Sequence, residues 1–185
     1  ITQGQFGFYD PARKTDVRLA LDSQARGMGN GEPPISVEGG GQWSGNTFTL
    51  SGTAESPLEL RKARRPYRID LRAAAGATRA HARGTLLDPL RLRDFDLELA
   101  LRGKNLADLY PLIGVVTPDT PPFSLDGRLT RDITAGRTTW HYDGFSGKVG
   151  DSDLGGDAAV TTGGPRPLLQ ADLQSRRLDF DDLAG

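Results

Sequence analysis

Three aspartates, Asp151, Asp153 and Asp157, have the residue type and part of the spacing that calcium binding needs. Asp151 and Asp153 match positions 1 and 3 of a calcium-binding loop, and Gly156 matches the glycine required at position 6. A glycine also stands at ligand position 5, and Thr162 stands at position 12, where the loop needs a bidentate glutamate. Because these oxygen ligands are missing, we expect a structural turn here, with a weak cation site as the alternative.

Two glycine-rich segments bear a partial likeness to phosphate-binding loops. Segment 144–148, GFSGK, lacks the four-residue spacer of such a loop, and Val149 stands where a Ser or Thr should hold the metal. Segment 27–31, GMGNG, lacks the G-x-G-x-x-G spacing and leads into prolines rather than into a helix. We expect the first segment to be part of a hairpin and the second to be a loop.

A hydrolase would need a nucleophile beside a general base. The two histidines, His81 and His141, both fall on what should be the polar faces of strands, and no serine lies in a G-x-S-x-G motif. Carboxylate pairs such as Asp94 and Asp96 could serve a glycosidase, but a chain with 24 acidic residues holds such pairs by chance. We therefore predict no catalytic residue, no cofactor and no metal, and keep a carbohydrate hydrolase as the least favoured alternative.

Composition excludes several classes of protein. The 185 residues include 23 Lys and Arg against 24 Asp and Glu, a net charge of -1 that argues against a general electrostatic grip on nucleic acid. There is no cysteine for disulfides or thiol chemistry, and 24 glycines with 12 prolines argue against a helical bundle. The basic stretch 61–65 is expected to be a solvated loop, with contact to anionic headgroups or a protein partner as the alternative.

No run of apolar residues is long enough to span a bilayer as a helix, and the first residue, Ile1, opens no signal-peptide pattern. We therefore expect an excised or processed segment whose membrane anchor, if the parent protein has one, lies outside it.

The elements that must position any site are β-strands, because the dominant period of the sequence is two. Alternating apolar and charged residues predict strands with one apolar and one polar face, which is typical of an antiparallel sheet with one face in water. The alternation is clear over 16–22, 68–73, 94–102, 125–130 and 169–174. Further strands are predicted at 35–38, 47–53, 78–86, 138–143 and 145–149.

Helix is predicted only in short pieces. Asn105 is a good N-cap, and the leucines that follow form a stripe through Ile113, while Pro111 limits this helix to about two turns. The segment 181–184 is a second candidate. In the turn at 149–156, we predict a positive φ at Gly150 or Gly155.

An internal repeat is also predicted. The pattern at Leu101, with Leu106 and Asp108 after it, recurs about 72 residues later at Leu173, with Leu178 and Asp182 after it. The chain is therefore predicted to be one strand-rich segment, 1–185, that could hold two repeat units, about 1–110 and 111–185.

Several longer motifs point to a known family. They are DLEL at 96–99, LADLYPL at 106–112, LDGRL at 125–129 and GKVGDSDLGG at 147–156, with strand and turn units upstream at 82–89. With these motifs the chain resembles the AsmA family of bacterial envelope proteins over about three-quarters of its length. No motif in the resemblance is catalytic.

The resemblance implies a periplasmic segment of a protein anchored in the bacterial inner membrane, with a role in outer-membrane biogenesis. It further implies that phospholipid or another acyl lipid binds or moves along an apolar β-groove between the inner and outer membranes, with other envelope proteins as further partners. This sequence departs from the family in lacking the anchoring helix and in being short, so it would hold only part of such a groove.

The residues and the resemblance together predict a mainly β fold: a curved antiparallel sheet that forms an open β-groove, with one or two short helices. The alternative is a closed β-sandwich that acts as a scaffold or a protein-interaction module, since a sandwich buries its two apolar faces against each other. In an open groove the apolar face would stay available to acyl chains. The side chains expected to line it are Ile69, Leu71, Leu97, Leu99, Leu101, Leu125, Leu129, Leu169 and Leu173.

Overall fold

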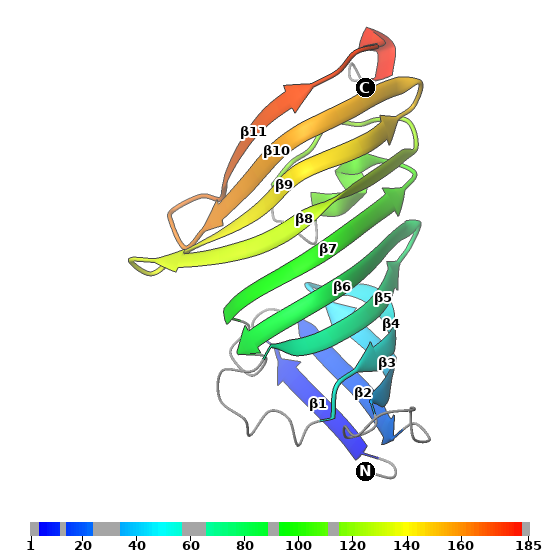
Figure 1. Ribbon diagram of the computed structural model, residues 1–185, viewed down its shortest axis with the longest axis vertical. Helices are drawn as coiled ribbons and strands as arrows, with labels where there is room; N and C mark the ends of the chain where they lie inside the picture. Colours follow the sequence, from blue (N-terminus) through cyan, green and yellow to red (C-terminus); the bar gives the residue numbers. More distant parts are fainter. Residues whose placement is uncertain are drawn as a thin grey trace.

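The computed structural model describes residues 4–11, 14–23, 34–56, 66–88, 93–110 and 115–182. These residues form one antiparallel sheet of eleven strands, which lie side by side in the order in which they occur in the chain (Figure 1). The strands are β1 (Gly4–Asp10), β2 (Thr15–Ser23), β3 (Ile35–Trp43), β4 (Asn46–Ala54), β5 (Tyr67–Ala75), β6 (Thr78–Asp88), β7 (Arg93–Gly103), β8 (Phe123–Thr134), β9 (Arg137–Val149), β10 (Ser152–Thr162) and β11 (Leu168–Gln174).

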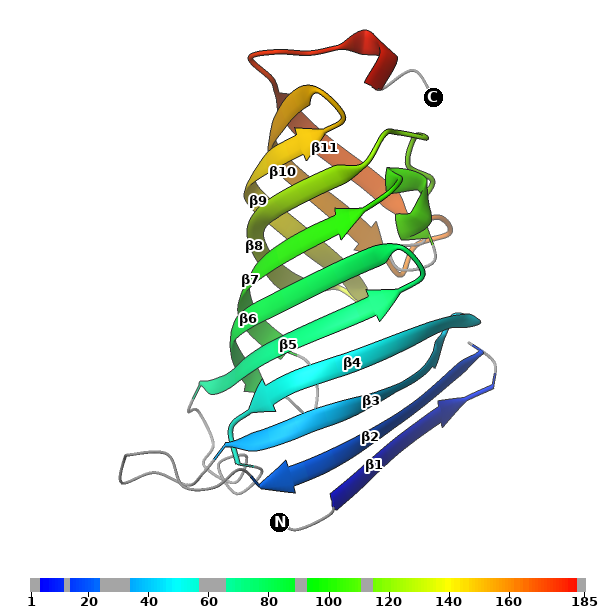
Figure 2. The same cartoon turned by 90° about the vertical axis from the view of Figure 1, so that its right-hand side faces the viewer.

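The sheet does not close on itself. Strands β1 and β11 are its two edges, and Figure 2 shows the sheet curling between them into an open trough. The predicted curved antiparallel sheet is therefore confirmed. The β-sandwich alternative is wrong for the described residues, because they form a single sheet rather than two packed ones.

Tight turns join several pairs of neighbouring strands. The β3–β4 and β8–β9 hairpins turn at Ser44–Gly45 and Ala135–Gly136, and all four residues have a positive φ. Two central residues with positive φ match the right-handed twist of the flanking strands, so they favour the two-residue hairpin. Gly150, in the β9–β10 turn, has a φ of 58°, which confirms the prediction for that segment.

All ten segments predicted as strands lie in strands, but two strands are missing from that prediction. One is β1, and the other is β10, whose glycines and alanines have low strand propensity; its flanking partners β9 and β11 decide its structure. The segments predicted separately at 138–143 and 145–149 are one strand, β9. A bulge at Gly144, with a φ of 55°, shifts the register there and reverses the alternation.

The predicted helix at 105–113 is a single 3-10 turn within the described residues, η2 (Leu106–Leu109). The predicted cap is confirmed, since Asn105 Oδ1 accepts a hydrogen bond of 2.9 Å from the Ala107 N–H. The second candidate is likewise a 3-10 turn, η3 (Phe180–Asp182). The remainder of both predictions, the loop predicted at 27–31 and the basic stretch 61–65 lie outside the described residues.

The core lies on one face of the sheet and forms two clusters. The first runs over β3 to β7, and the second runs over β8 to β10 with η2 packed on it. The buried residues of the first cluster are Ile35, Val37, Ala54, Tyr67, Leu86, Phe95 and Leu97. In the second cluster they are Leu109, Phe123, Leu125, Phe145, Val149 and Leu154.

Contacts between non-adjacent strands show that this apolar face is the inner side of the curve. Phe95 on β7 and Trp140 on β9 have ring centroids 5.6 Å apart, although β8 lies between them. The Tyr142 hydroxyl on β9 reaches over β8 in the same way and donates a hydrogen bond of 3.0 Å to the Leu99 carbonyl. Gly127 on β8 leaves room for this, since a Cβ there would lie 2.8 Å from the Tyr142 ring.

Candidate functional site

Cross-strand register places the nine predicted lining residues on the inner face. Leu97 lies opposite Leu129 on one side and Gly84 on the other, and Gly84 lies opposite Ile69. Because directly opposed residues of antiparallel strands share a face, these three apolar side chains point to the same side. The same reasoning places the rows Leu71–Ala82–Leu99 and Ala80–Leu101–Leu125 beside them.

Leu169 and Leu173 are on the same face but not beside the leucines of β7. They belong to β11, and β8, β9 and β10 separate them from β7. Leu169 lies opposite Val160, which in turn lies opposite Trp140, so the apolar strip continues to the edge strand through residues that we did not predict. Within the sheet they are therefore not neighbours of the β7 leucines.

Sequence reasoning also missed apolar residues at the other end of the strip. Phe6 and Phe8 on β1 lie opposite Leu19 and Val17 on β2, which puts both rings on the inner face. The alternation of β2 was visible, but the pattern at 4–10 mixes glycine with aromatic residues, so it gave no clear strand signal. Leu50 on β4, which lies opposite Ala73, also belongs to this face.

Exposure of the strip rises toward the edges of the sheet. Leu97 and Leu125 are buried, Leu71, Leu99 and Leu101 are half-buried, and Leu173 is 52% exposed. On β1, Phe6 is also 52% exposed. A hollow of about 220 Å³ opens on this face at the ends of β3 to β6, with aromatic walls and a floor of small side chains: Trp43, Phe48, Ala73, Ala75, Thr78 and Ala80.

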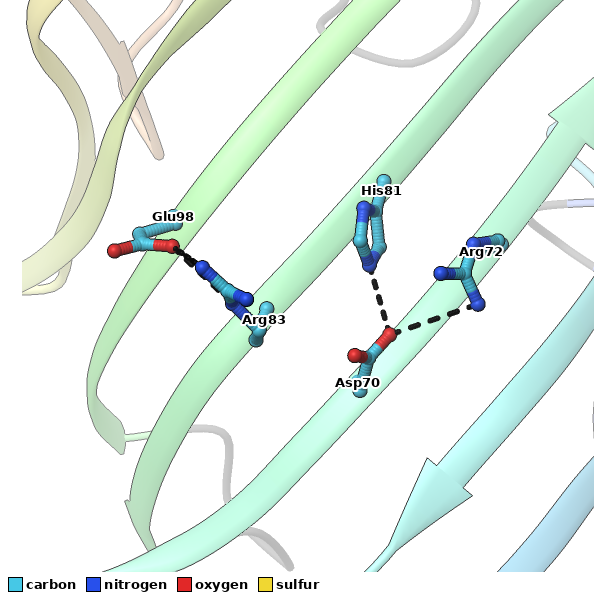
Figure 3. Close-up of polar contacts among 5 residues, drawn as sticks. All are labelled: Asp70, Arg72, His81, Arg83 and Glu98. Atoms are coloured by element: carbon cyan, nitrogen blue, oxygen red, sulfur yellow. Dashed lines mark hydrogen bonds and ion pairs between the residues drawn. The ribbon is translucent and has the colours of Figure 1, made fainter.

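The opposite face carries charged residues in a row of alternating sign. Asp70, Arg83, Glu98, Arg128 and Asp143 lie directly opposite one another on β5 to β9. Figure 3 shows part of this row, where Arg83 contacts Glu98. Such pairs on an exposed face contribute little individually, but together they favour contact of this face with water.

Arg128 also forms an ion pair with Asp96, a second carboxylate on β7. Arg128 Nε and Nη2 donate to the two carboxylate oxygens of Asp96, both at 2.6 Å, in a bidentate arrangement. These hydrogen bonds lower the pKa of Asp96, because they favour its charged form over the opposing effect of desolvation.

His81 forms the arrangement that comes nearest to catalytic geometry. Its Nε2 lies 2.8 Å from Asp70 Oδ1, and Arg72 Nη1 lies 3.8 Å from the same oxygen (Figure 3). A triad would need a nucleophile on the other ring nitrogen. The hollow beside His81 is lined by Arg83, Glu98, Leu99, Ala100, Asp126, Gly127, Arg128, Asp143 and Gly144, which include no hydroxyl or thiol within the described part of the chain.

Replacing His81 with alanine is therefore expected to leave function unchanged in a complementation assay, and His141→Ala is expected to do the same. His81 contributes one partly exposed hydrogen bond to Asp70, which is worth about 1 kcal/mol or less. Complementation and the melting temperature should be measured together. A folded His81→Ala protein that fails to complement would favour the hydrolase hypothesis instead.

Two aspartates of the calcium-like segment, Asp153 and Asp157, accept hydrogen bonds from backbone N–H groups. Asp153 Oδ1 accepts hydrogen bonds from Arg177 N at 2.7 Å and Arg176 N at 3.0 Å, and these bonds lower its pKa. Asp157 Oδ1 accepts from Gly144 N at 2.7 Å, at the β9 bulge. Within the described ranges, no three His, Asp or Glu side chains are grouped so as to bind a metal ion.

Comparisons with known proteins identify relatives over nearly the whole chain. The sequence model of the AsmA family matches residues 22–185. The AsmA family protein YhjG of Escherichia coli (strain K12) is 34% identical over 197 aligned positions, which cover 98% of this chain and 29% of that protein. The chain thus spans less than a third of the length of this relative. No solved structure matches it, and no helix among the described residues is long and apolar enough to cross a membrane.

Proposed function

The chain belongs to the AsmA family, and from this premise we propose that it is a non-enzymatic segment of an envelope protein that serves outer-membrane biogenesis by binding acyl lipid. The lipid lies along the apolar inner face and is conducted between the inner and outer membranes. The segment works in the periplasm, and the inner-membrane anchor of the protein lies outside it.

One observation carries this proposal: an apolar face runs across all eleven strands of an unclosed sheet. Its half-buried members, such as Leu71 and Leu99, have exposed surface left to bury, and so do Phe6 and Leu173 at the edges. Each CH₂ group transferred from water onto such a face gains about 0.8 kcal/mol. An acyl chain can therefore be held without any specific polar contact, and it can slide from one strand to the next.

The charged outer face supports the same proposal. Its cross-strand pairs, including Arg83–Glu98 and Arg128–Asp96, keep that side of the sheet in water. A sheet with one charged and one apolar side separates lipid from water along its whole length. This is the arrangement that a lipid needs in order to cross an aqueous space.

Site-specific photo-cross-linking tests the proposal in the intact protein. A photoreactive amino acid at position 71 points to the apolar face of β5, and the same amino acid at position 72 points to the charged face. We expect lipid adducts at position 71 and none at position 72, detected by mass spectrometry after irradiation in cells. Equal lipid labelling at both positions would contradict a lipid site on the apolar face. Lipid at neither position would contradict lipid binding. Protein adducts alone at position 71 would favour the scaffold alternative.

A further inference from the structure

The outer face carries a second row of charges at one rim of the sheet, at the right of Figure 1, where β7 and β9 end. Arg79 on β6 lies directly opposite Arg102 on β7. Arg102 lies opposite Ser124 on β8, and Ser124 lies opposite Lys148 on β9. Residues two or four apart along a strand share a face, so Arg79 points to the same side as Arg83 of the charged ladder. We call Arg79, Arg102 and Lys148 the basic row.

The basic row has charges of one sign, unlike the ladder beside it. In the ladder, Arg83 lies between Asp70 and Glu98, so its neighbours on both sides are of opposite charge. Arg79 instead lies between Arg102 and a neutral alanine on β5. Directly opposed side chains of antiparallel strands have Cβ atoms about 5 Å apart, and like charges at that separation repel. A bound anion would remove this repulsion.

The cations of the row have no carboxylate partner within the described part of the chain. Arg79 Nη1 donates hydrogen bonds to the carbonyl oxygens of Gly76 at 2.7 Å and Thr78 at 3.0 Å, which position the guanidinium without neutralising it. The ion pairs among the described residues include neither Arg102 nor Lys148. All three side chains of the row are exposed. Their charges are therefore accessible to an external anion.

Two carboxylates lie near the row but do not form ion pairs with it. Asp126 occupies the next row on the same face, diagonal to Arg102. Asp153 lies opposite Lys148, but its Oδ1 accepts hydrogen bonds from the backbone N–H groups of residues 176–177. These bonds compete with Lys148 for the carboxylate, so the row keeps an excess of positive charge.

The surroundings of the row favour a narrow anion over a broad one. Asp126 and Glu98 are exposed on the same face. A flat anionic membrane surface laid against the outer face would approach these carboxylates as well as the cations, and they would repel it. An extended acidic peptide that crosses β6 to β9 contacts the row alone. Its alternate side chains lie about 7 Å apart, which long Arg and Lys side chains on neighbouring strands can match.

We propose that the basic row of Arg79, Arg102 and Lys148 binds an extended acidic segment of a partner protein on the outer face. This inference goes beyond the proposed function, because the partner lies on the side of the sheet opposite the lipid. The same strands can therefore hold lipid on one face and a protein partner on the other at the same time.

Photo-cross-linking of the intact protein in cells tests this surface. A photoreactive amino acid at Ser124, between Arg102 and Lys148, should form protein adducts whose cross-linked peptide is rich in Asp and Glu. Arg102→Gln should reduce these adducts about fivefold, and Arg102→Lys, which keeps the charge, should retain them. Ser51, an exposed serine on the outer face of β4, is the matched control position and should give no such adduct.

A defined probe provides a second measurement on the purified intact protein in detergent. The probe is a fluorescein-labelled decapeptide of alternating Glu and Ser, and its binding is followed by fluorescence anisotropy. Arg102→Gln should weaken binding about fivefold, whereas Arg128→Gln should leave it unchanged, because Arg128 is paired with Asp96. Both variants lower the net charge equally, so the comparison separates the row from general electrostatic attraction. The same peptide with Gln in place of Glu should not bind.

The other outcomes overturn the proposal. Lipid adducts alone at position 124 would assign the row to a membrane surface. Protein adducts that persist in Arg102→Gln, or whose peptides carry no acidic residues, would exclude recognition by charge, and the absence of any adduct would exclude a partner here. Equal weakening of the probe by Arg102→Gln and Arg128→Gln would reduce the row to general attraction. None of these results bears on lipid at the inner face, so the proposed function is judged separately.

Discussion

Aspartate in place of Leu99 is expected to abolish binding of acyl lipid while the protein stays folded. Leu99 is half-buried near the middle of the inner face, between Ala82 on β6 and Gly127 on β8. In the lipid-free protein, a carboxylate there keeps part of its hydration. Beneath an acyl chain it would lose that water without gaining a partner, at a cost of several kcal/mol. We expect bound lipid to fall at least tenfold, measured by mass spectrometry of the purified protein.

The matched control places the same charge on the other face. Ser51 on β4 is exposed and lies opposite Arg72, so Ser51→Asp should bind lipid as the wild type does. Melting curves of both variants show whether the fold survives. If Leu99→Asp unfolds the protein, or if it keeps its lipid, the inner face is not an open lipid surface at this position.

The second large effect is expected at Asp182, which ties the C-terminal turn η3 to the β9–β10 hairpin. The residue is 8% exposed, and its Oδ2 accepts hydrogen bonds from Asp151 N at 3.0 Å, Ser152 N at 2.8 Å and Ser152 Oγ at 2.8 Å. Gly150 leaves space for it, since a Cβ at that position would lie 2.1 Å from Asp182 Oδ1. The glycine and the aspartate therefore form one unit.

Asp182→Ala should lower the free energy of unfolding by about 3 kcal/mol, because it leaves the buried N–H and hydroxyl of Ser152 and the partly buried N–H of Asp151 without their acceptor. Urea unfolding measures this. Asp181→Ala, an exposed neighbour in the same turn, is the control and should change stability by less than about 0.5 kcal/mol. A similar stability for both variants would show that η3 is not held by this carboxylate.

Local alternation was enough to predict most strands and the shared face of the leucines, because successive side chains of a strand point to opposite sides whatever lies around them. Where the alternation is interrupted, the prediction divided one strand, β9, into two. Before Gly144, the residues of β9 that point to the inner face have even numbers, as Trp140 and Tyr142 do. After Gly144 they have odd numbers, as Phe145 and Val149 do. A bulge produces that switch, and in the sequence it resembles the end of one strand and the start of another.

Other features depend on pairing, which a single strand does not reveal. β10 is a strand because β9 and β11 flank it, despite its glycines and alanines. The contact of His81 with Asp70 follows from the β5–β6 register, and the stacking of Arg131 on Trp140 follows from the β8–β9 register. Arg131 also falls just past the stretch of clear alternation at 125–130, so nothing in the pattern placed it on the apolar side.

The simple succession of strands has a consequence for how the chain acquires its structure. Each strand pairs with the strand that precedes it in the chain, so no pairing has to wait for a strand that is made later. A chain that emerges end first, from a ribosome or through a membrane pore, can therefore add one hairpin at a time to a growing template. Contacts such as that of Tyr142 with Leu99, 43 residues apart, form only after the intervening strands are in place. We therefore expect the trough to assemble progressively rather than in one collapse.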